Sequence, residues 1–370
     1  MDIVTDQKIP ENPVDWDYII RTIKQGKCII VMGPGLARTT AKQRFLTSFV
    51  ESLDIDKNER ITSFYAHEEL FLFPNVQQKT RIVVDMEEFY EKDFFRTPYE
   101  ILSQLPVRLF INASPDHFLA RVMEASHPAK GMFHKGDPQR DFDAPSVEQP
   151  LIYNLVGDIY HEESLLLTHD DLFEFIEAVL ANQKLPQVIK DELFSARSLI
   201  FLGLSFDKWY VQLLLRLLKV HDPNTKFTTY STFGTYNEET LSICTQQFRI
   251  EFIDHGVDAF LDELEQRCDL EGGILLDRGV MQEERMERNL EKQAEVKNLI
   301  REDKLEEALE EMETEFRERK DQDKLDELLA LQGRMTGLDN EEAFGHTDPE
   351  ARKRERNAIR LAAIKLANHI

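Results

Sequence analysis

The chain has 370 residues, of which 42% are hydrophobic and 31% are charged, so it holds enough apolar material for one large core and a smaller second one. Its net charge of -24 repels nucleic acid phosphates and anionic membrane surfaces, and we expect neither as a direct partner. Cys28, Cys244 and Cys268 lie far apart without metal-ligand spacing, which predicts buried thiols in a reducing compartment. No apolar run approaches the roughly 20 residues that span a bilayer, and we therefore predict a cytoplasmic protein.

The first part of the chain alternates between helix-like segments and short apolar runs. Helical spacing of apolar residues predicts a helix at 16–24, which Gly26 ends, and the run at 28–32 predicts a buried strand. Further apolar runs predict strands at 82–84, 107–111, 165–167, 198–202 and 227–230. Buried strands that alternate with helices favour an α/β fold with a doubly wound, mostly parallel sheet. The stretch at 127–149 lacks apolar periodicity, which predicts a long surface loop.

The composition changes after residue 268. Gly272, Gly273 and Gly279 precede a stretch dominated by Glu, Lys, Arg, Leu and Ala. We expect a domain boundary here, with an α/β domain at 1–272 and a small all-helical domain at 283–370.

The C-terminal domain shows the pattern of amphipathic helices. They are expected at 283–304, 305–319, 323–336 and 349–369. Gly333, Gly337 and Gly345 are predicted to interrupt or end helices. Asp348 can cap the last helix, and Pro349 is tolerated at its first position. The mixed charges of these helices indicate either a solvated face or a recognition surface for a helical partner.

Two glycine-containing turns follow predicted strands. Gly33-Pro34-Gly35 leads from the strand at 28–32 toward a helix, a geometry in which backbone N–H groups can face a pyrophosphate. It lacks the lysine of a P-loop, so an ordinary structural turn is the alternative.

The second turn, Gly-Leu-Ser-Phe-Asp at 203–207, follows the strand at 198–202 and precedes an apolar helix at 209–218. A small residue and a hydroxyl at the carboxyl end of a parallel strand lie where ligands enter doubly wound sheets. Helix capping is the alternative role for Ser205 and Asp207.

Five segments, these two turns included, resemble the bacterial sirtuin-like family, whose members bind NAD+ and often hydrolyse it. The segments are Gly-Pro-Gly-Leu-Ala at 33–37, Asn-Ala-Ser-Pro-Asp at 112–116, Tyr-Asn-Leu-Val-Gly-Asp at 153–158, Leu-Leu-Leu-Thr-His-Asp-Asp-Leu-Phe at 165–173 and Gly-Leu-Ser-Phe-Asp at 203–207. The resemblance implies a Rossmann-like, sirtuin-like fold with NAD+ or an ADP-ribose-type nucleotide as its ligand. It also implies a nucleotide-binding set, which is Gly33, Pro34, Gly35, Ala37, Gly157, Gly203, Ser205 and Asp207. Within this set, the first turn is expected at the pyrophosphate and the second on the adenosine side.

The residues that carry the family's chemistry differ in this chain. In that family an Asn and a His act on the glycosidic bond, and the resemblance puts Ser114 at the Asn position and Val156 at the His position. A valine cannot transfer a proton, and losing general acid–base assistance typically costs a factor of about 10²–10⁴. Asn112 is an alternative, because residues two apart on a strand point to the same face. Asp116 is expected, with Ser114, near the nicotinamide ribose, and helix capping is its alternative role.

Several histidines are candidates for the missing base. Each has an ordinary surface or capping role as its alternative, and they are His117, His127, His134, His161 and His169. The four-cysteine zinc module of the family's deacylase members has no counterpart in this sequence, so we expect neither lysine deacylation nor a bound metal.

The C-terminal segment resembles the effector-associated domains of bacterial conflict systems, which are small helical adaptors. The resemblance rests on segments at 299–309, 328–335 and 355–362. It implies like-to-like pairing with a protein partner, and a dimerisation appendage is the alternative.

These observations leave two functions open. One is an NAD+ hydrolase effector in antiphage defence, inactive until the helical domain assembles with a partner. The other is a catalytically silent nucleotide-binding or scaffold module that recruits a partner through that domain. We also expect a homo-oligomer. Both functions require one cleft shared by the first turn and the strand ends near Ser114 and Ser205.

Overall fold

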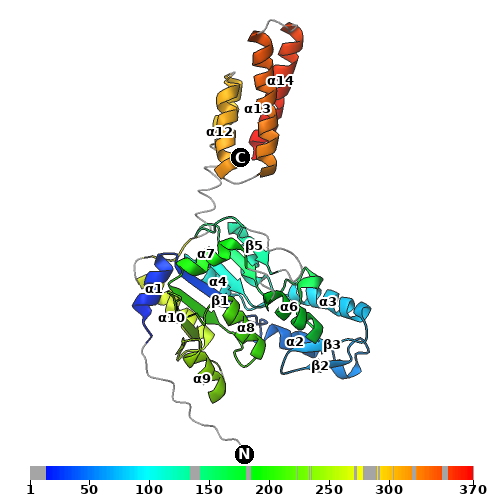
Figure 1. Ribbon diagram of the computed structural model, residues 1–370, viewed down its shortest axis with the longest axis vertical. Helices are drawn as coiled ribbons and strands as arrows, with labels where there is room; N and C mark the ends of the chain where they lie inside the picture. Colours follow the sequence, from blue (N-terminus) through cyan, green and yellow to red (C-terminus); the bar gives the residue numbers. More distant parts are fainter. Residues whose placement is uncertain are drawn as a thin grey trace, which may run out of the picture. The chain divides into compact units, whose positions relative to one another are not determined.

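The computed structural model describes residues 14–133, 142–180, 185–222, 224–232, 234, 236–270, 273–277, 290, 292–302, 304–318, 322–343 and 349–369. The chain forms two compact units, Met1–Arg278 and Gly279–Ile370 (Figure 1).

The first unit is built on a seven-stranded sheet in which every neighbouring pair of strands is parallel. Its order is β5-β6-β4-β1-β7-β8-β9. The strands are β1 (Cys28–Met32), β4 (Leu109–Asn112), β5 (Ala129–Met132), β6 (Leu151–Asn154), β7 (Ser198–Leu202), β8 (Thr228–Thr232) and β9 (Ile250–Ile253). This sheet confirms the expected Rossmann-like α/β fold. A separate antiparallel hairpin joins β2 (Ser63–Tyr65) to β3 (Leu70–Leu72).

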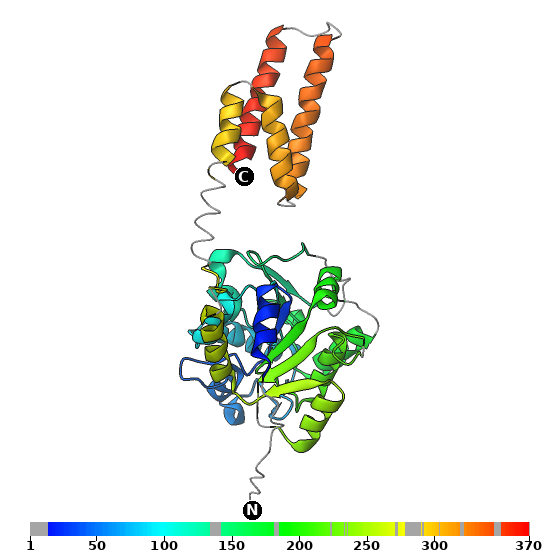
Figure 2. The same cartoon turned by 90° about the vertical axis from the view of Figure 1, so that its left-hand side faces the viewer.

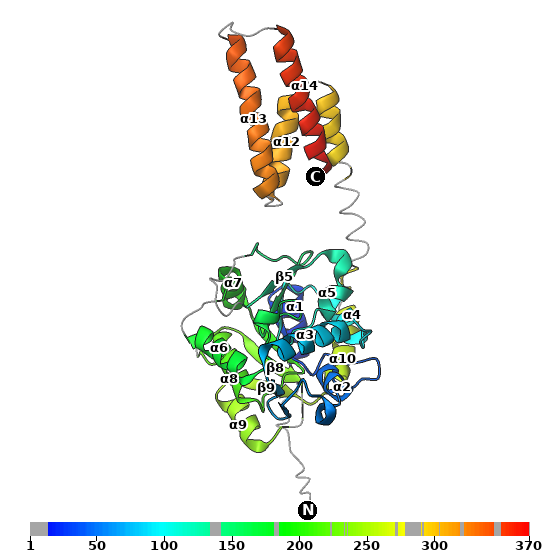
Figure 3. The ribbon, with the colours of Figure 1, turned by 90° about the vertical axis from the view of Figure 1, so that its right-hand side faces the viewer.

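Alternate residues of the central strands face two separate apolar cores. Ile30 and Ile200 pack into one core, and Val31 and Phe201 pack into the other, because successive side chains of a strand point to opposite faces. The first core is closed by α1 (Trp16–Lys24), α2 (Phe45–Ser52), α3 (Val76–Tyr90), α4 (Thr97–Gln104), α5 (Phe118–Val122) and α10 (Val257–Leu270). The second is closed by α6 (His169–Leu180), α7 (Gln187–Ser195), α8 (Trp209–Leu217) and α9 (Glu238–Gln246). Figure 3 shows these two helical layers on opposite sides of the sheet.

Polar side chains fix where several helices begin. The carboxylate of Asp15 accepts a hydrogen bond from the Tyr18 N–H at 3.0 Å, and the amide oxygen of Asn75 accepts one from Gln78 at 3.0 Å. Each satisfies a backbone donor that has no partner within its helix.

The chain order creates a crevice beside β1. From β1 the chain continues to β4 on one side, and it later returns to β7 on the other side. Loops that leave the carboxyl ends of these strands therefore diverge, which opens the crevice where open α/β sheets bind ligands.

Several predicted elements agree with the structure, and others do not. The helix at 16–24 and the strands at 28–32 and 198–202 are confirmed at both ends. The run at 82–84 was wrongly expected to be a strand, because it lies within α3, where Ile82 and Val83 are buried and Val84 is exposed. The run at 165–167 is irregular. The predicted loop at 127–149 contains β5, and its residues 134–141 lie outside the described residues.

The second unit is helical. It contains a helical segment at 292–301 followed by α12 (Leu305–Glu318), α13 (Gln322–Ala343) and α14 (Pro349–Leu366), which run alongside one another (Figure 2). Their core includes Phe316, Leu328 and Ile359. The start of the last helix at Pro349 is confirmed. The expected interruptions at Gly333 and Gly337 are wrong, because α13 continues through both exposed glycines. Gly345 lies outside the described residues.

Candidate functional site

A cavity opens at the carboxyl ends of the central strands. The empty space within it is about 910 Å³, open solvent included. Its walls come from the ends of β1, β4, β6 and β7, from the β2–β3 turn, and from α2, α3, α6 and α8. The residues that line it are Pro34, Ala37, Leu46, Glu68, Glu69, Leu70, Met86, Tyr90, Ala113, Ser114, Pro115, Val156, Leu165, Leu166, Leu167, Leu172, Leu204, Ser205, Lys208, Tyr210, Val211 and Leu214.

The shared cleft that both candidate functions require is therefore present. Five of the residues singled out from the sequence line it, and they are Pro34, Ala37, Ser114, Val156 and Ser205. Seven others do not, and they are Gly33, Gly35, Asn112, Asp116, Gly157, Gly203 and Asp207.

The glycines of the two turns serve a close backbone contact. Gly33 N–H donates to the Leu202 carbonyl at 2.8 Å, and Gly35 N–H donates to the Gly203 carbonyl at 2.9 Å. A Cβ on Gly35 would lie 2.8 Å from that carbonyl oxygen. These two N–H groups are thus already bonded within the protein, unlike the free donors expected of a phosphate loop. This contact makes any side chain at residue 35 disruptive to the packing of the two turns, so a substitution such as Gly35→Val would not leave the fold intact.

Asn112 shapes the turn that presents Ser114 to the cavity. Its Nδ2 donates to the Asp116 carbonyl at 2.9 Å, and its Oδ1 accepts from the Ser114 N–H at 3.1 Å. Because both ends of the amide are bonded inside this turn and the residue does not line the cavity, the geometry gives no support to a displaced catalytic Asn.

Asp116 lies beneath the same turn and is buried. Its Oδ1 accepts from the N–H of Phe118, the first residue of α5, at 3.1 Å, although the N-cap position of this helix belongs to His117. Burial raises the pKa of Asp116 above its ordinary value, although the Ser114 hydroxyl and the Phe118 N–H oppose the shift. Asp116 lines a small neighbouring pocket together with Asn112, His117 and Asn154.

None of the histidines proposed for the missing base lines the cavity in the described part of the chain. His117 is mostly buried, and its Nε2 lies 2.8 Å from Asp158 Oδ1. Burial alone would raise the pKa of Asp158, but His117 and the Tyr160 N–H outweigh burial and hold it below its ordinary value. His127 and His161 are exposed, and His169 packs edge-on against Tyr65. His134 lies outside the described residues.

Gly157 and Asp207 also lie away from the cavity lining. Gly157 has a φ of 101°, a conformation that favours glycine, and its Cα packs against the Ser164 carbonyl. Asp207 is exposed.

Lys208 and Glu69, which line the cavity, form an ion cluster with Arg44 that the sequence did not predict. Lys208, only 5% exposed, forms an ion pair with Glu69, whose carboxylate also accepts from Arg44 Nη1 at 2.5 Å. Burial acts to raise the pKa of Glu69, but the two cations outweigh it, so the pKa lies below its ordinary value. Burial lowers the pKa of Lys208, against the opposing effect of Glu69. The position of Lys208 immediately after the second turn was the available signal.

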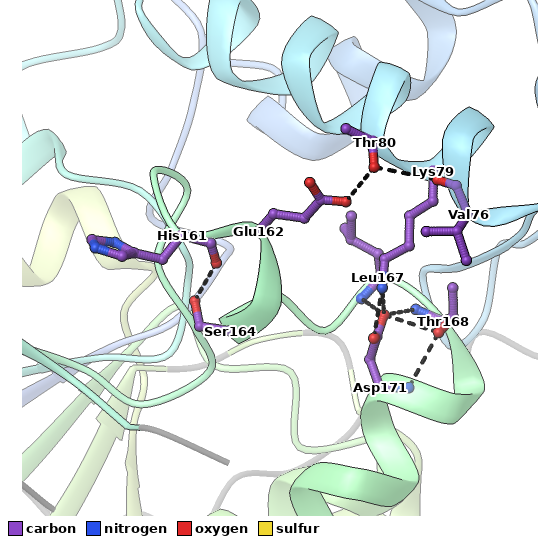
Figure 4. A network of polar contacts seen from close by, with 9 residues as sticks. All are labelled: Val76, Lys79, Thr80, His161, Glu162, Ser164, Leu167, Thr168 and Asp171. Carbon is purple, nitrogen blue, oxygen red and sulfur yellow. Dashed lines mark hydrogen bonds and ion pairs between the residues drawn. The ribbon is translucent and has the colours of Figure 1, made fainter. Parts of the chain in front are cut away.

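A polar network holds the wall formed by residues 165–167 (Figure 4). Asp171 accepts from Lys79 Nζ of α3 at 2.7 Å and from the Leu167 and Thr168 N–H groups at 3.1 and 2.9 Å. Thr80 Oγ1, also on α3, donates to Glu162 at 2.8 Å. The network ties the start of α6 to α3, so the apolar wall between them keeps its position.

Comparison with known families agrees with this architecture. The model of the SIR2-like domain matches residues 108–253, and that of Effector-associated domain 11 matches residues 291–370. The chain carries a SIR2-like domain and a C-terminal effector-associated domain. SIR2-like domains bind NAD+, and the combination of the two domains indicates a defence-type effector. A comparison with curated proteins found no match.

Within the described ranges, no group of three or more His, Cys, Asp or Glu side chains is arranged to hold a metal ion. No helix in this part of the chain is long and apolar enough to cross a membrane.

The contact between the two turns generates a first prediction. Gly203 has a φ of 67°, and a Cβ there would lie 2.7 Å from Leu36 N. Because an L-residue in this conformation costs about 1–2 kcal/mol before any clash, Gly203→Ala should lower the melting temperature of the first unit by several degrees in calorimetry. Gly256→Ala is the matched control, since nothing lies within 4 Å of its added Cβ. Equal melting temperatures for the two variants would contradict the role given to this contact.

The polar network around Asp171 generates a second prediction. Asp171→Ala removes a mostly buried ion pair and three hydrogen bonds from backbone and hydroxyl donors. A hydrogen bond to a charged group is worth about 1.5–3 kcal/mol, so we expect a loss of at least roughly 2 kcal/mol in denaturant unfolding. Asp170→Ala removes the exposed carboxylate next to it and should change stability by less than about 0.5 kcal/mol. Similar losses in both variants would argue against the network.

Proposed function

We propose that the SIR2-like domain binds NAD+ or an ADP-ribose-type dinucleotide in the cavity at the ends of β1, β4, β6 and β7, and that it turns NAD+ over slowly or not at all. The observation that carries the proposal is the cavity itself, which joins Pro34, Ser114 and Ser205 from three different strand ends. Its apolar walls suit the flat rings of a dinucleotide, and its hydroxyls suit the ribose oxygens. Ala37, Val156 and the second turn complete the proposed contact surface.

The replacement of both expected catalytic residues supports slow turnover. Val156 and Ser114 both line the cavity, and they are the residues that the resemblance places at the family's histidine and asparagine positions. No histidine in the described part of the chain lines the cavity. Without a positioned base, the attacking water receives little assistance.

Hydrolysis of NAD+ to nicotinamide and ADP-ribose is the second candidate function, and one observation favours it. Glu68 and Glu69 bring two carboxylates to the cavity lining. Cleavage of a glycosidic bond passes through an oxocarbenium-like transition state, which a carboxylate stabilises. Glu68 is the better placed of the two for this purpose, because the charge of Glu69 is already paired with Arg44 and Lys208.

Calorimetry with NAD+ and ADP-ribose tests the binding proposal on the full chain. We expect heat of binding from both ligands, and nicotinamide release from NAD+ close to that of a no-protein control. Absence of binding by either ligand would overturn the proposal. Rapid nicotinamide release that Glu68→Gln abolishes would establish the hydrolase instead.

Restoring the family's two residues gives a gain-of-function prediction. Ser114→Asn combined with Val156→His should raise nicotinamide release by about 10²–10⁴ over the natural chain, the usual contribution of a positioned acid–base group. Ser114→Asn combined with Val156→Leu is the control, because it alters the same positions without adding a base. If the first double variant binds NAD+ yet releases no more nicotinamide than the second, the assignment of these two positions is wrong.

We further propose that the effector-associated domain pairs with a like domain of a protein partner and of other copies of this chain, and that this assembly acts in antiphage defence. Leu361 on α14 is 63% exposed and Leu329 on α13 is 41% exposed, so both can contribute to such pairing. Leu331, which lies in the resembling segment at 328–335, is 5% exposed and belongs to the core of the helical unit.

Substitutions of Leu361 and of Leu331 are therefore expected to have different effects. Leu361→Ser should lower the mass of the assembly in light scattering without changing the melting temperature of the helical unit. Leu331→Ser should unfold that unit, because a polar group in a core costs about 1–3 kcal/mol beyond the lost apolar contacts. An unchanged mass for Leu361→Ser would exclude this face of α14 from the assembly.

A further inference from the structure

Lys208 is the one cation among the cavity-lining residues in the described part of the chain. It is the residue before α8, next to the turn that carries Ser205, and its side chain is 6% exposed. Burying a charged group costs free energy unless the group is paired and hydrogen-bonded. The arrangement around its ammonium group is therefore informative.

The ammonium group is only partly satisfied by the protein. It carries three N–H donors, and its ion-pair partner in the described part of the chain is Glu69. Among the described residues, Lys208 Nζ donates no hydrogen bond of normal geometry. Arg44 shares the same carboxylate, and its Nη2 is likewise buried without a partner there. Lys208 and Arg44 thus share the single carboxylate of Glu69. In this part of the chain, N–H donors of both cations remain without an acceptor, and a bound anion could accept from them.

We propose that Lys208 recognises the negatively charged diphosphate of the dinucleotide, and that Glu69 holds the ammonium group in place until the ligand enters. This inference rests on the binding function proposed above and adds the residue that selects for the diphosphate. A lysine ammonium is a compact charge that binds phosphate oxygens well. The apolar walls strengthen the attraction by lowering the local dielectric constant. Glu68, on the same turn as Glu69, carries the opposite charge and suits the cationic nicotinamide ring.

A purely structural role for Lys208 makes a different prediction. Glu69 lies at the end of the β2–β3 turn with a φ of 60°, and its ion pairs hold this turn against the ends of α2 and α8. If Lys208 served only to hold the turn, removing Glu69 would harm ligand binding as much as removing Lys208. If Lys208 binds the ligand, removing Glu69 frees the ammonium group and preserves or strengthens binding.

Calorimetry on the full chain with NAD+, ADP-ribose and adenosine separates these cases. Lys208→Met should weaken NAD+ and ADP-ribose by about 10- to 100-fold, the value of a hydrogen bond to a charged group. The affinity of Lys208→Met for adenosine, which has no phosphate, should stay within about twofold of that of the natural chain. Glu69→Gln should bind NAD+ at least as tightly as the natural chain does.

Each result has a definite consequence. If the natural chain binds neither NAD+ nor ADP-ribose, the proposed function falls and this inference falls with it. If it binds both and Lys208→Met binds them equally well, or if Glu69→Gln weakens them as much as Lys208→Met does, only the role of Lys208 is overturned. Should Lys208→Met melt at a lower temperature, the double variant Lys208→Met/Glu69→Gln removes both charges together. We expect the same loss of NAD+ affinity in that variant.

Discussion

The close approach of two backbone turns, one after β1 and one after β7, is the constraint on which the rest of the site depends. Gly33, Gly35 and Gly203 meet there at distances that leave no room for side chains. Two backbone hydrogen bonds join the first turn to the last residue of β7 and to the second turn. Because this contact fixes the ends of the two central strands, it also fixes the floor from which Pro34 and Ser205 face the cavity.

The loops around this floor are held by polar groups that do not themselves line the cavity. Asn112 is fully engaged in shaping the turn at Ser114, and the pair of Lys79 and Asp171 holds the apolar wall. The lining itself is mostly apolar, and its polar groups are a few hydroxyls, the carboxylate of Glu68 and one ion cluster. Such a surface suits a ligand held by its shape and by a small number of charged contacts, as proposed for the dinucleotide.

Much of this fold could be predicted from the sequence, and the limits have physical reasons. Strands that are buried on both faces, such as 28–32 and 198–202, appear as uninterrupted apolar runs bounded by turn residues. The run at 82–84 looked the same, but its neighbours belong to a longer amphipathic helix that an Asn cap begins. β5 (Ala129–Met132), with a lysine and a glycine in four residues, carries no apolar run and gave no signal. Family resemblance brought Ser114, Val156 and Ser205 to one region, and the cavity joins them. Lys208 and Glu69 meet only in three dimensions, since 139 positions separate them in the chain, and no local pattern marks such a pair.

The central place of β1 has a consequence for how the domain can be divided. The part that matches the SIR2-like family starts at residue 108, whereas β1 spans Cys28–Met32 and lies between β4 and β7. Those two strands hydrogen-bond to β1 on its opposite edges and not to each other. In a fragment confined to the matched residues, the edges of β4 and β7 that pair with β1 would have no partner strand. The fragment would also lack the turn after β1 that forms part of the cavity floor. The proposed ligand binding therefore depends on the whole unit, because the cavity needs the segment that follows β1 as well as the matched residues.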